Sequence, residues 1–130
     1  MFPKILLVED YIAIQLNFKE AFDNTDFDVE IQCADGQEEL LNIINSGWIP
    51  DVALIDHHLV GTIKGSDIAG MFDVTFPEVK LISVSAMRQV GYPKRTEHIS
   101  KMYITNKDFI KALIKWAQDE TKTLEWSKFT

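Results

Sequence analysis

The sequence predicts a single α/β domain in which helices cover both faces of a parallel five-stranded sheet. Three observations support this prediction. Short apolar runs alternate with amphipathic stretches along almost the whole chain. The apolar runs are continuous, which is typical of strands that are buried on both faces. With 130 residues, the chain has the size of one domain with a single core.

Five segments are predicted to be strands. Each is a brief apolar run bounded by polar residues, glycine or proline. Residues 4–8, 51–55 and 80–84 have the composition of fully buried strands. The other two predicted strands are residues 29–34 and residues 102–105.

Helical periodicity fills most of the sequence between the predicted strands. The first helix is predicted over residues 11–22, because four apolar side chains recur there at the spacing of one helix face. These inward-facing residues are Ile14, Phe18, Ala21 and Phe22. Further helices are predicted over residues 35–44, 66–76 and 108–118.

Two segments lack a clear pattern. Gly91 and Pro93 interrupt any helix over residues 87–100, so this connection should be short or irregular. The domain is expected to span residues 1–118. Residues 119–130 should form a tail that either extends the last helix or frays.

The composition limits the functions that the chain can have. The net charge of −7 argues against direct binding to the phosphates of nucleic acids. The apolar run at the N-terminus is too short for a signal peptide or a membrane span. The single cysteine, Cys33, permits no internal disulfide and fits a reducing compartment, so we expect a cytoplasmic protein that does not enter membranes.

Polar side chains follow three of the predicted strands at the point where each strand ends. Glu9 and Asp10 follow the first strand, Asp56 follows the third, and Ser85 follows the fourth. The carboxyl ends of parallel strands meet at one edge of the sheet, where ligands bind in open α/β folds. Three carboxylates and a hydroxyl at this edge indicate a divalent metal and phosphoryl chemistry.

Taken together, these residues resemble the receiver domain of two-component response regulators, over roughly residues 2–118. The family has an acidic pair after its first strand, matched by Glu9 and Asp10, and a phospho-accepting aspartate after its third, matched by Asp56. It has a serine or threonine followed by alanine after its fourth strand, matched at Ser85. An aromatic residue and a lysine follow, which Tyr103 and Lys107 match.

The resemblance implies a doubly wound, flavodoxin-like sheet of strand order 2-1-3-4-5 and a bound Mg²⁺ ion. Asp10 and Asp56 would be direct ligands of the ion, Glu9 a direct or water-mediated one, and His58 would contribute its backbone carbonyl. Asp56 would receive a phosphoryl group from a histidine kinase or a phosphotransfer protein and lose it by hydrolysis. The chain would thus phosphorylate and dephosphorylate itself without being a dedicated enzyme.

The resemblance also implies a switch and a set of partners. Ser85 would bind the phosphoryl group, and Tyr103 would move into the space that the Ser85 loop vacates. The altered surface would bind an output protein, whose identity the sequence does not give, or a second copy of the chain in a phosphorylation-linked homodimer.

The lysine has more than one candidate. In the family it often lies three residues after the aromatic residue, and here that position is Asn106. Lys107 lies 22 residues after Ser85, which is the usual separation, and it is therefore the preferred residue. Asn106, with loss of the ammonium, and Lys101 remain as alternatives.

Other functions fit the sequence less well. A flavodoxin-like cofactor binder needs a phosphate loop after the first strand, where two acidic residues would repel a phosphate. A phosphatase of the haloacid dehalogenase type needs an aspartate two residues after the nucleophile, where His58 stands. A zinc site is not indicated, since the neighbouring His57 and His58 do not face the same way on an extended chain. The remaining alternative is a degenerate receiver that binds partners without phosphorylation.

Overall fold

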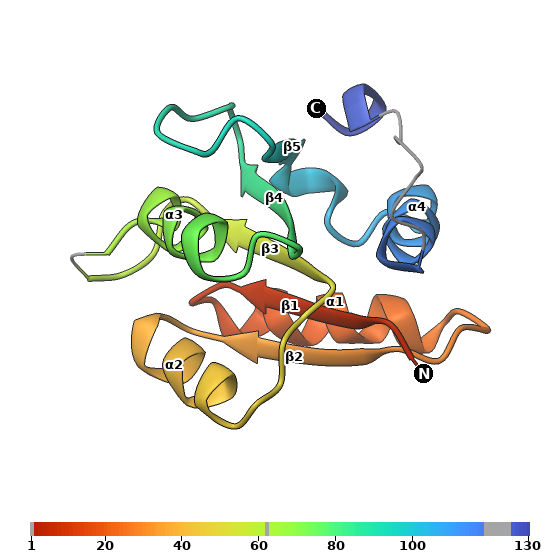
Figure 1. Cartoon of the computed structure of the whole chain (residues 1–130). Coiled ribbons are helices and arrows are strands. Elements are labelled where there is room, and N and C mark those ends of the chain that lie inside the picture. The colour runs from red at the N-terminus through yellow and green to blue at the C-terminus, as the bar shows by residue number, and fades with distance from the viewer. Residues whose placement is uncertain (1, 62, 119–125) are drawn as a thin grey trace.

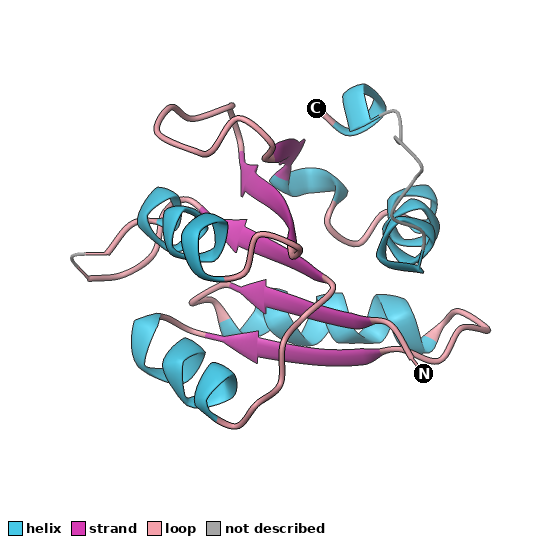
Figure 2. Ribbon diagram, in the orientation of Figure 1, coloured by secondary structure: helices cyan, strands magenta, loops and turns pink. Residues whose placement is uncertain are grey.

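The computed structural model of the chain describes residues 2–61, 63–118 and 126–130. A five-stranded sheet lies at the centre, with helices packed on both sides (Figure 1, Figure 2). The strands are β1 (Lys4–Val8), β2 (Glu30–Ala34), β3 (Val52–Asp56), β4 (Lys80–Ser85) and β5 (Glu97–Ser100). The α-helices are α1 (Ile12–Asp23), α2 (Gln37–Asn45), α3 (Gly65–Thr75) and α4 (Lys107–Gln118). Short 3-10 helices follow β5 and α4, namely η1 (Lys101–Tyr103) and η2 (Trp126–Phe129).

The sheet has the predicted topology. Its strand order is β2-β1-β3-β4-β5, and all four neighbouring pairs are parallel. The registers align the carboxyl ends of the strands, with Val8 opposite Ala34 and Ile55, and with Ser85 opposite Ser100. The residues that end or follow these strands therefore share one edge of the sheet, as predicted.

Both faces of the central strands are buried, which explains their continuous apolar runs. In β1, Ile5 and Leu7 pack into a cluster that includes Phe18 of α1 and Phe109 of α4. Leu6 and Val8 point to the other face. There they pack into a cluster that is completed by side chains of α2 and α3. The doubly covered parallel sheet is thus confirmed.

The four predicted α-helices lie within a few residues of their expected limits. On the predicted inner face of α1, Phe18 and Phe22 are buried, and Ile14 and Ala21 pack at the margin of the core. Within the described ranges, no helix combines the length and apolar character that a membrane crossing requires.

The fifth strand does not form where it was predicted. β5 spans Glu97–Ser100, whereas the predicted segment, residues 102–105, forms part of η1 and the turn after it. The prediction was wrong because the connection after β4 contains no helix between residues 86 and 96, so the chain returns to the sheet early. Only Ile99 is strongly apolar in β5, which leaves this strand without a clear hydrophobic pattern.

The core also includes residues beyond the predicted boundary at 118. Trp126 and Phe129 of η2 are buried, and their rings lie 5.8 and 5.4 Å from the ring of Phe109. Trp126 also packs edge-on against Trp116 of α4, at 5.0 Å between ring centroids. Residues 119–125 lie outside the described residues, so extension of the last helix stays a prediction.

Candidate functional site

Three carboxylates converge at the carboxyl edge of the sheet, as the sequence predicted. Glu9 and Asp10 follow β1, and Asp56 is the last residue of β3. One carboxylate oxygen of each residue lies within 4.8 Å of the other two. Glu9 and Asp56 are buried, and Asp10 is half-buried with its Oδ2 accepting a hydrogen bond from the Val60 amide at 3.1 Å. The loop after β3 is thereby tied to the acidic pair.

The surroundings of Glu9 change its protonation. Burial and the neighbouring Asp56 carboxylate raise the pKa of Glu9 to about 7, and the ammonium of Lys101 partly opposes this rise. Desolvation disfavours the charged form, and a second negative charge disfavours it further. The pocket therefore favours the binding of positive charge.

Lys101 supplies that positive charge. Its Nζ lies 3.3 Å from Asp56 Oδ2 and 3.2 Å from Glu9 Oε2. Partial burial acts to lower the pKa of Lys101, but the Asp56 and Glu9 carboxylates outweigh it and raise the pKa above its usual value. The ammonium is thus held in its charged form beside the expected phospho-acceptor.

The structure places Lys101, and not Lys107, against Asp56. Lys107 is exposed at the start of α4, where it lines a hollow together with Thr25 and Asp26. These two residues precede β2 and therefore lie at the opposite edge of the sheet. The prediction for Lys107 was wrong because the usual separation of 22 residues from Ser85 holds only where a helix connects β4 and β5. Without that helix, the ammonium comes 16 residues after Ser85.

Ser85 lies at the expected edge, but Tyr103 does not lie on the fifth strand. The buried Ser85 hydroxyl donates a hydrogen bond to the Met87 carbonyl in its own loop. Tyr103 belongs to η1, where its ring packs edge-on against Phe129 of η2 at 5.7 Å. The prediction that Tyr103 is the strand aromatic is therefore wrong, for the same reason as the misplaced strand.

The residue at the strand position is a histidine. His98 is buried on β5, three residues before Lys101, which is the aromatic-to-lysine spacing of the family pattern. Its Nδ1 lies 3.1 Å from the Ser83 hydroxyl. Burial, with Arg88 nearby, lowers the pKa of His98. The pair His98 and Lys101 was the sequence signal that could have located both β5 and the lysine.

The two histidines after Asp56 differ in their surroundings. The His58 side chain is exposed and packs edge-on against the His57 ring at 4.9 Å. The His57 ring is partly buried, and its Nδ1 lies 3.1 Å from the hydroxyl of Tyr92. Among the described residues, the group of possible metal ligands contains carboxylates only.

The fold is similar to that of known receiver domains. The match to response regulator DrrB from Thermotoga maritima has a TM-score of 0.72 and 18% identity, and it covers 100% of this chain and 63% of DrrB. A CheY-like receiver domain protein from Methanospirillum hungatei JF-1 matches with a TM-score of 0.71 and 21% identity, over 92% of this chain and 99% of that one. This chain has the receiver-domain fold. No protein-family model matches the sequence, and no curated protein matches it significantly.

A third receiver-fold neighbour bears on the metal. The Mn²⁺-bound form of response regulator Rcp1 matches with a TM-score of 0.63 and 14% identity, over 95% of this chain and 98% of Rcp1. In the present chain, the buried Asp56 Oδ1 has no hydrogen-bond partner among the described residues. Mg²⁺ prefers hard oxygen ligands such as carboxylates. The unpaired Asp56 Oδ1 is an oxygen of this kind. The residues present therefore fit a divalent cation.

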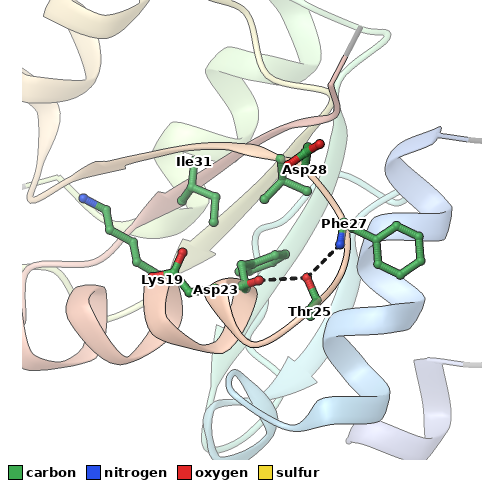
Figure 3. Close-up of a pocket in the computed structure, with 8 residues that line it drawn as sticks. Lys19, Asp23, Thr25, Phe27, Asp28 and Ile31 are labelled. Atoms are coloured by element: carbon green, nitrogen blue, oxygen red, sulfur yellow. Dashed lines mark hydrogen bonds between the residues drawn. The ribbon is translucent and has the colours of Figure 1, made fainter.

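Another hollow lies away from this acidic site. A space of about 400 Å³ opens between the end of α1 and the start of β2, where Lys19, Asp23 and Ile31 are among the residues that line it (Figure 3). The Thr25 hydroxyl donates to the Phe22 carbonyl there and accepts a hydrogen bond from the Phe27 amide. These contacts stabilise the turn into β2, and Glu9, Asp10 and Asp56 lie at the other edge of the sheet.

Proposed function

We propose that the chain is a phosphorylation-dependent signalling switch whose phospho-acceptor is Asp56. A carboxylate oxygen of Asp56 forms a bond to phosphorus while the P–N bond of a phosphohistidine, on a histidine kinase or a phosphotransfer protein, breaks. The electron pair passes to the imidazole nitrogen, which takes up a proton. Water later hydrolyses the acyl phosphate, which restores the Asp56 carboxylate and releases inorganic phosphate.

The observation that supports this proposal most directly is the surroundings of Asp56. A lone carboxylate repels an incoming phosphoryl group, but here an ammonium lies within 3.3 Å and two further carboxylates create a cation site. Mg²⁺ would be held by oxygens of Glu9, Asp10 and Asp56, with the backbone carbonyl of His58 as a further ligand. When bound, it would neutralise the charge that develops during phosphoryl transfer.

The chain's own residues would divide the remaining work. Lys101 can exchange its contact with Asp56 for one with a phosphoryl oxygen, since its ammonium is a compact charge on a flexible stem. Ser85 can donate its hydroxyl to another phosphoryl oxygen, once it leaves the Met87 carbonyl. This change of hydrogen-bond partner by Ser85 would move the loop after β4 and alter the surface near β5. An output protein or a second copy of the chain would bind to that surface.

The first helix provides a candidate docking surface for the phosphodonor protein. Tyr11, Ile12 and Leu16 are 67%, 61% and 60% exposed, although all three are large apolar residues. Tyr11 and Ile12 directly follow Glu9 and Asp10, and Leu16 lies about one helical turn further along α1. A histidine kinase or phosphotransfer protein that packs on this surface would bring its phosphohistidine to Asp56, and such an encounter would take place in the cytoplasm.

A second candidate function is a degenerate receiver that binds partners without phosphorylation. It is favoured by one observation: residues 86–96 form no helix, so the surface beside β5 differs from the family pattern. Phosphorylation chemistry separates the two functions, because both use the same fold.

The decisive experiment is phosphorylation by a small-molecule donor. The protein is incubated with Mg²⁺ and acetyl phosphate or phosphoramidate, and the intact mass is measured. We expect one added phosphoryl group that is stable in acid and labile to hydroxylamine. It should be lost in Asp56→Asn and retained in Asp28→Asn, which changes an exposed aspartate at the opposite edge. Failure of the parent protein to be labelled would favour the degenerate receiver.

A further inference from the structure

The hydroxyl of Tyr92 reaches across the carboxyl edge to the residue that follows Asp56. Tyr92 belongs to the β4–β5 connection, and its hydroxyl lies 3.1 Å from Nδ1 of His57, 35 positions earlier in the chain. The two rings are tilted by 48°, with 5.8 Å between their centroids. A segment that contains no helix thus makes a direct side-chain contact with the phospho-acceptor loop.

Gly65 makes this contact possible. A Cβ at Gly65 would lie 2.5 Å from the Tyr92 hydroxyl and 2.9 Å from the Cα of His57, and it would also clash with the Asp56 carbonyl oxygen. The Gly65 amide donates to the His57 carbonyl at 3.3 Å. Position 65 therefore has no room for a side chain. The start of α3 can approach His57 and the ring of Tyr92 only because this residue is glycine.

The Tyr92 end of the contact is itself held in place. Its half-buried ring packs against the apolar cluster on the α2 and α3 side of the sheet. Three residues later, Arg95 pairs with Asp73 of α3 at 2.7 Å and also donates to the Val79 carbonyl. Burial, followed by the Asp56 and Asp67 carboxylates, raises the pKa of Tyr92, so its hydroxyl keeps its proton at neutral pH and can donate.

His57 occupies a sensitive position between the two halves of the expected metal site. Its amide donates to the Val84 carbonyl at 3.2 Å, on the neighbouring strand, and its carbonyl accepts from Gly65. Asp56 precedes it, and His58, the expected carbonyl ligand, follows it. Rotation of the His57 backbone would move that carbonyl, and Mg²⁺ tolerates little departure from octahedral geometry.

We propose that Tyr92 is a positioning residue for the Mg²⁺ site, which it stabilises by fixing His57 between Asp56 and His58. The inference rests on the proposed function and adds a residue from outside the acidic set. Partners that orient ligands from a second layer commonly change metal affinity by about 10- to 100-fold when they are removed. Tyr92 holds a backbone segment rather than a ligand side chain, so its effect should lie at the lower end of that range.

The test compares Tyr92→Phe with Tyr103→Phe, a matched variant of a half-buried tyrosine that packs against Phe129 instead. Mg²⁺ titration should give a dissociation constant about tenfold higher for Tyr92→Phe than for the parent, and a parental value for Tyr103→Phe. In metal-free protein, amide hydrogen exchange at Gly65 should accelerate in Tyr92→Phe alone. His57→Leu should reproduce the loss of affinity, and the double variant should lose little more, because both changes remove one contact.

The outcomes separate this inference from the function on which it rests. Parental Mg²⁺ affinity in Tyr92→Phe would overturn the positioning role, even if exchange at Gly65 accelerates, because the contact would then be structural only. An equal loss of affinity in Tyr103→Phe, or additive losses in the double variant, would also overturn it. In all these cases the parent protein is still labelled on Asp56, whereas failure of the proposed function would abolish labelling in the parent itself.

Discussion

Replacement of Lys101 by alanine tests the most specific feature of the candidate site. The substitution removes the ammonium that contacts both Asp56 and Glu9 and leaves two buried carboxylates without their counter-charge. Since Lys101 lowers the pKa of Glu9, this pKa should rise further above its present value of about 7. The incoming phosphoryl group would then approach the Asp56 carboxylate without the ammonium that balances its negative charge.

The size of the effect follows from distance and exposure. Two unit charges 3.3 Å apart attract each other by about 5 kcal/mol at an effective dielectric constant near 20, and by about 1 kcal/mol in water. The Lys101 side chain is 34% exposed, so solvent screening brings the interaction toward the lower figure. A loss of about 1.4 to 2.7 kcal/mol corresponds to phosphorylation that is about 10- to 100-fold slower.

The assay is the rate of labelling by acetyl phosphate, followed by intact-mass measurement at saturating Mg²⁺. Lys107→Ala is the matched control, because it removes an exposed lysine at the opposite edge of the sheet and should leave the rate unchanged. Slow labelling of Lys107→Ala together with parental labelling of Lys101→Ala would refute the reasoning, and with it the relevance of the observed ion pairs.

Three further predictions concern the metal, a buried histidine and the C-terminal segment. Asp10→Ala should raise the dissociation constant for Mg²⁺ about tenfold or more in a calorimetric titration, and equal affinity would contradict the cation site. Burial, reinforced by Arg88, lowers the pKa of His98, so its contribution to stability is present above the unfolded pKa of about 6.5 and is lost as the pH falls through the folded pKa. The free energy of unfolding of the parent, minus that of His98→Gln, should therefore shrink below pH 6.5 in urea titrations, and a constant difference would contradict this. Trp126→Ala should cost about 3–5 kcal/mol of unfolding free energy, whereas the exposed Ser127→Ala should cost little, and similar stability of both variants would show that η2 is not part of the core.

The sequence was sufficient to predict four of the five strands and the carboxyl edge of the sheet, because both depend on local patterns. A strand that is covered on both faces must be apolar throughout, and this pattern is plain in β1 and β3. Glu9, Asp10 and Asp56 adjoin those strands directly, so no long connection separates each carboxylate from the element that positions it. The acidic cluster was therefore predictable to the residue.

Contacts between distant segments were not predictable in the same way. The pairing of Tyr92 with His57 joins two irregular loops, and neither loop has a periodicity that fixes its path. The packing of Trp126 against Phe109 likewise joins residues that are 17 positions apart in the sequence. Such contacts depend on tertiary structure, and the final segment was predicted only to extend the last helix or to fray.

The misplaced lysine shows which sequence intervals are physically constrained. Between Ser85 and Lys101 the chain crosses an irregular connection, whose length can change without moving either strand end. Between His98 and Lys101 it follows a strand and its exit, where each residue advances the chain by about 3.3 Å. The interval from a strand residue to the lysine is therefore fixed by geometry, whereas the interval from Ser85 is fixed only when the intervening helix is present. Because residues 86–96 form no helix here, the shorter interval gives the correct residue, and it assigns to His98 the strand position that was predicted for Tyr103.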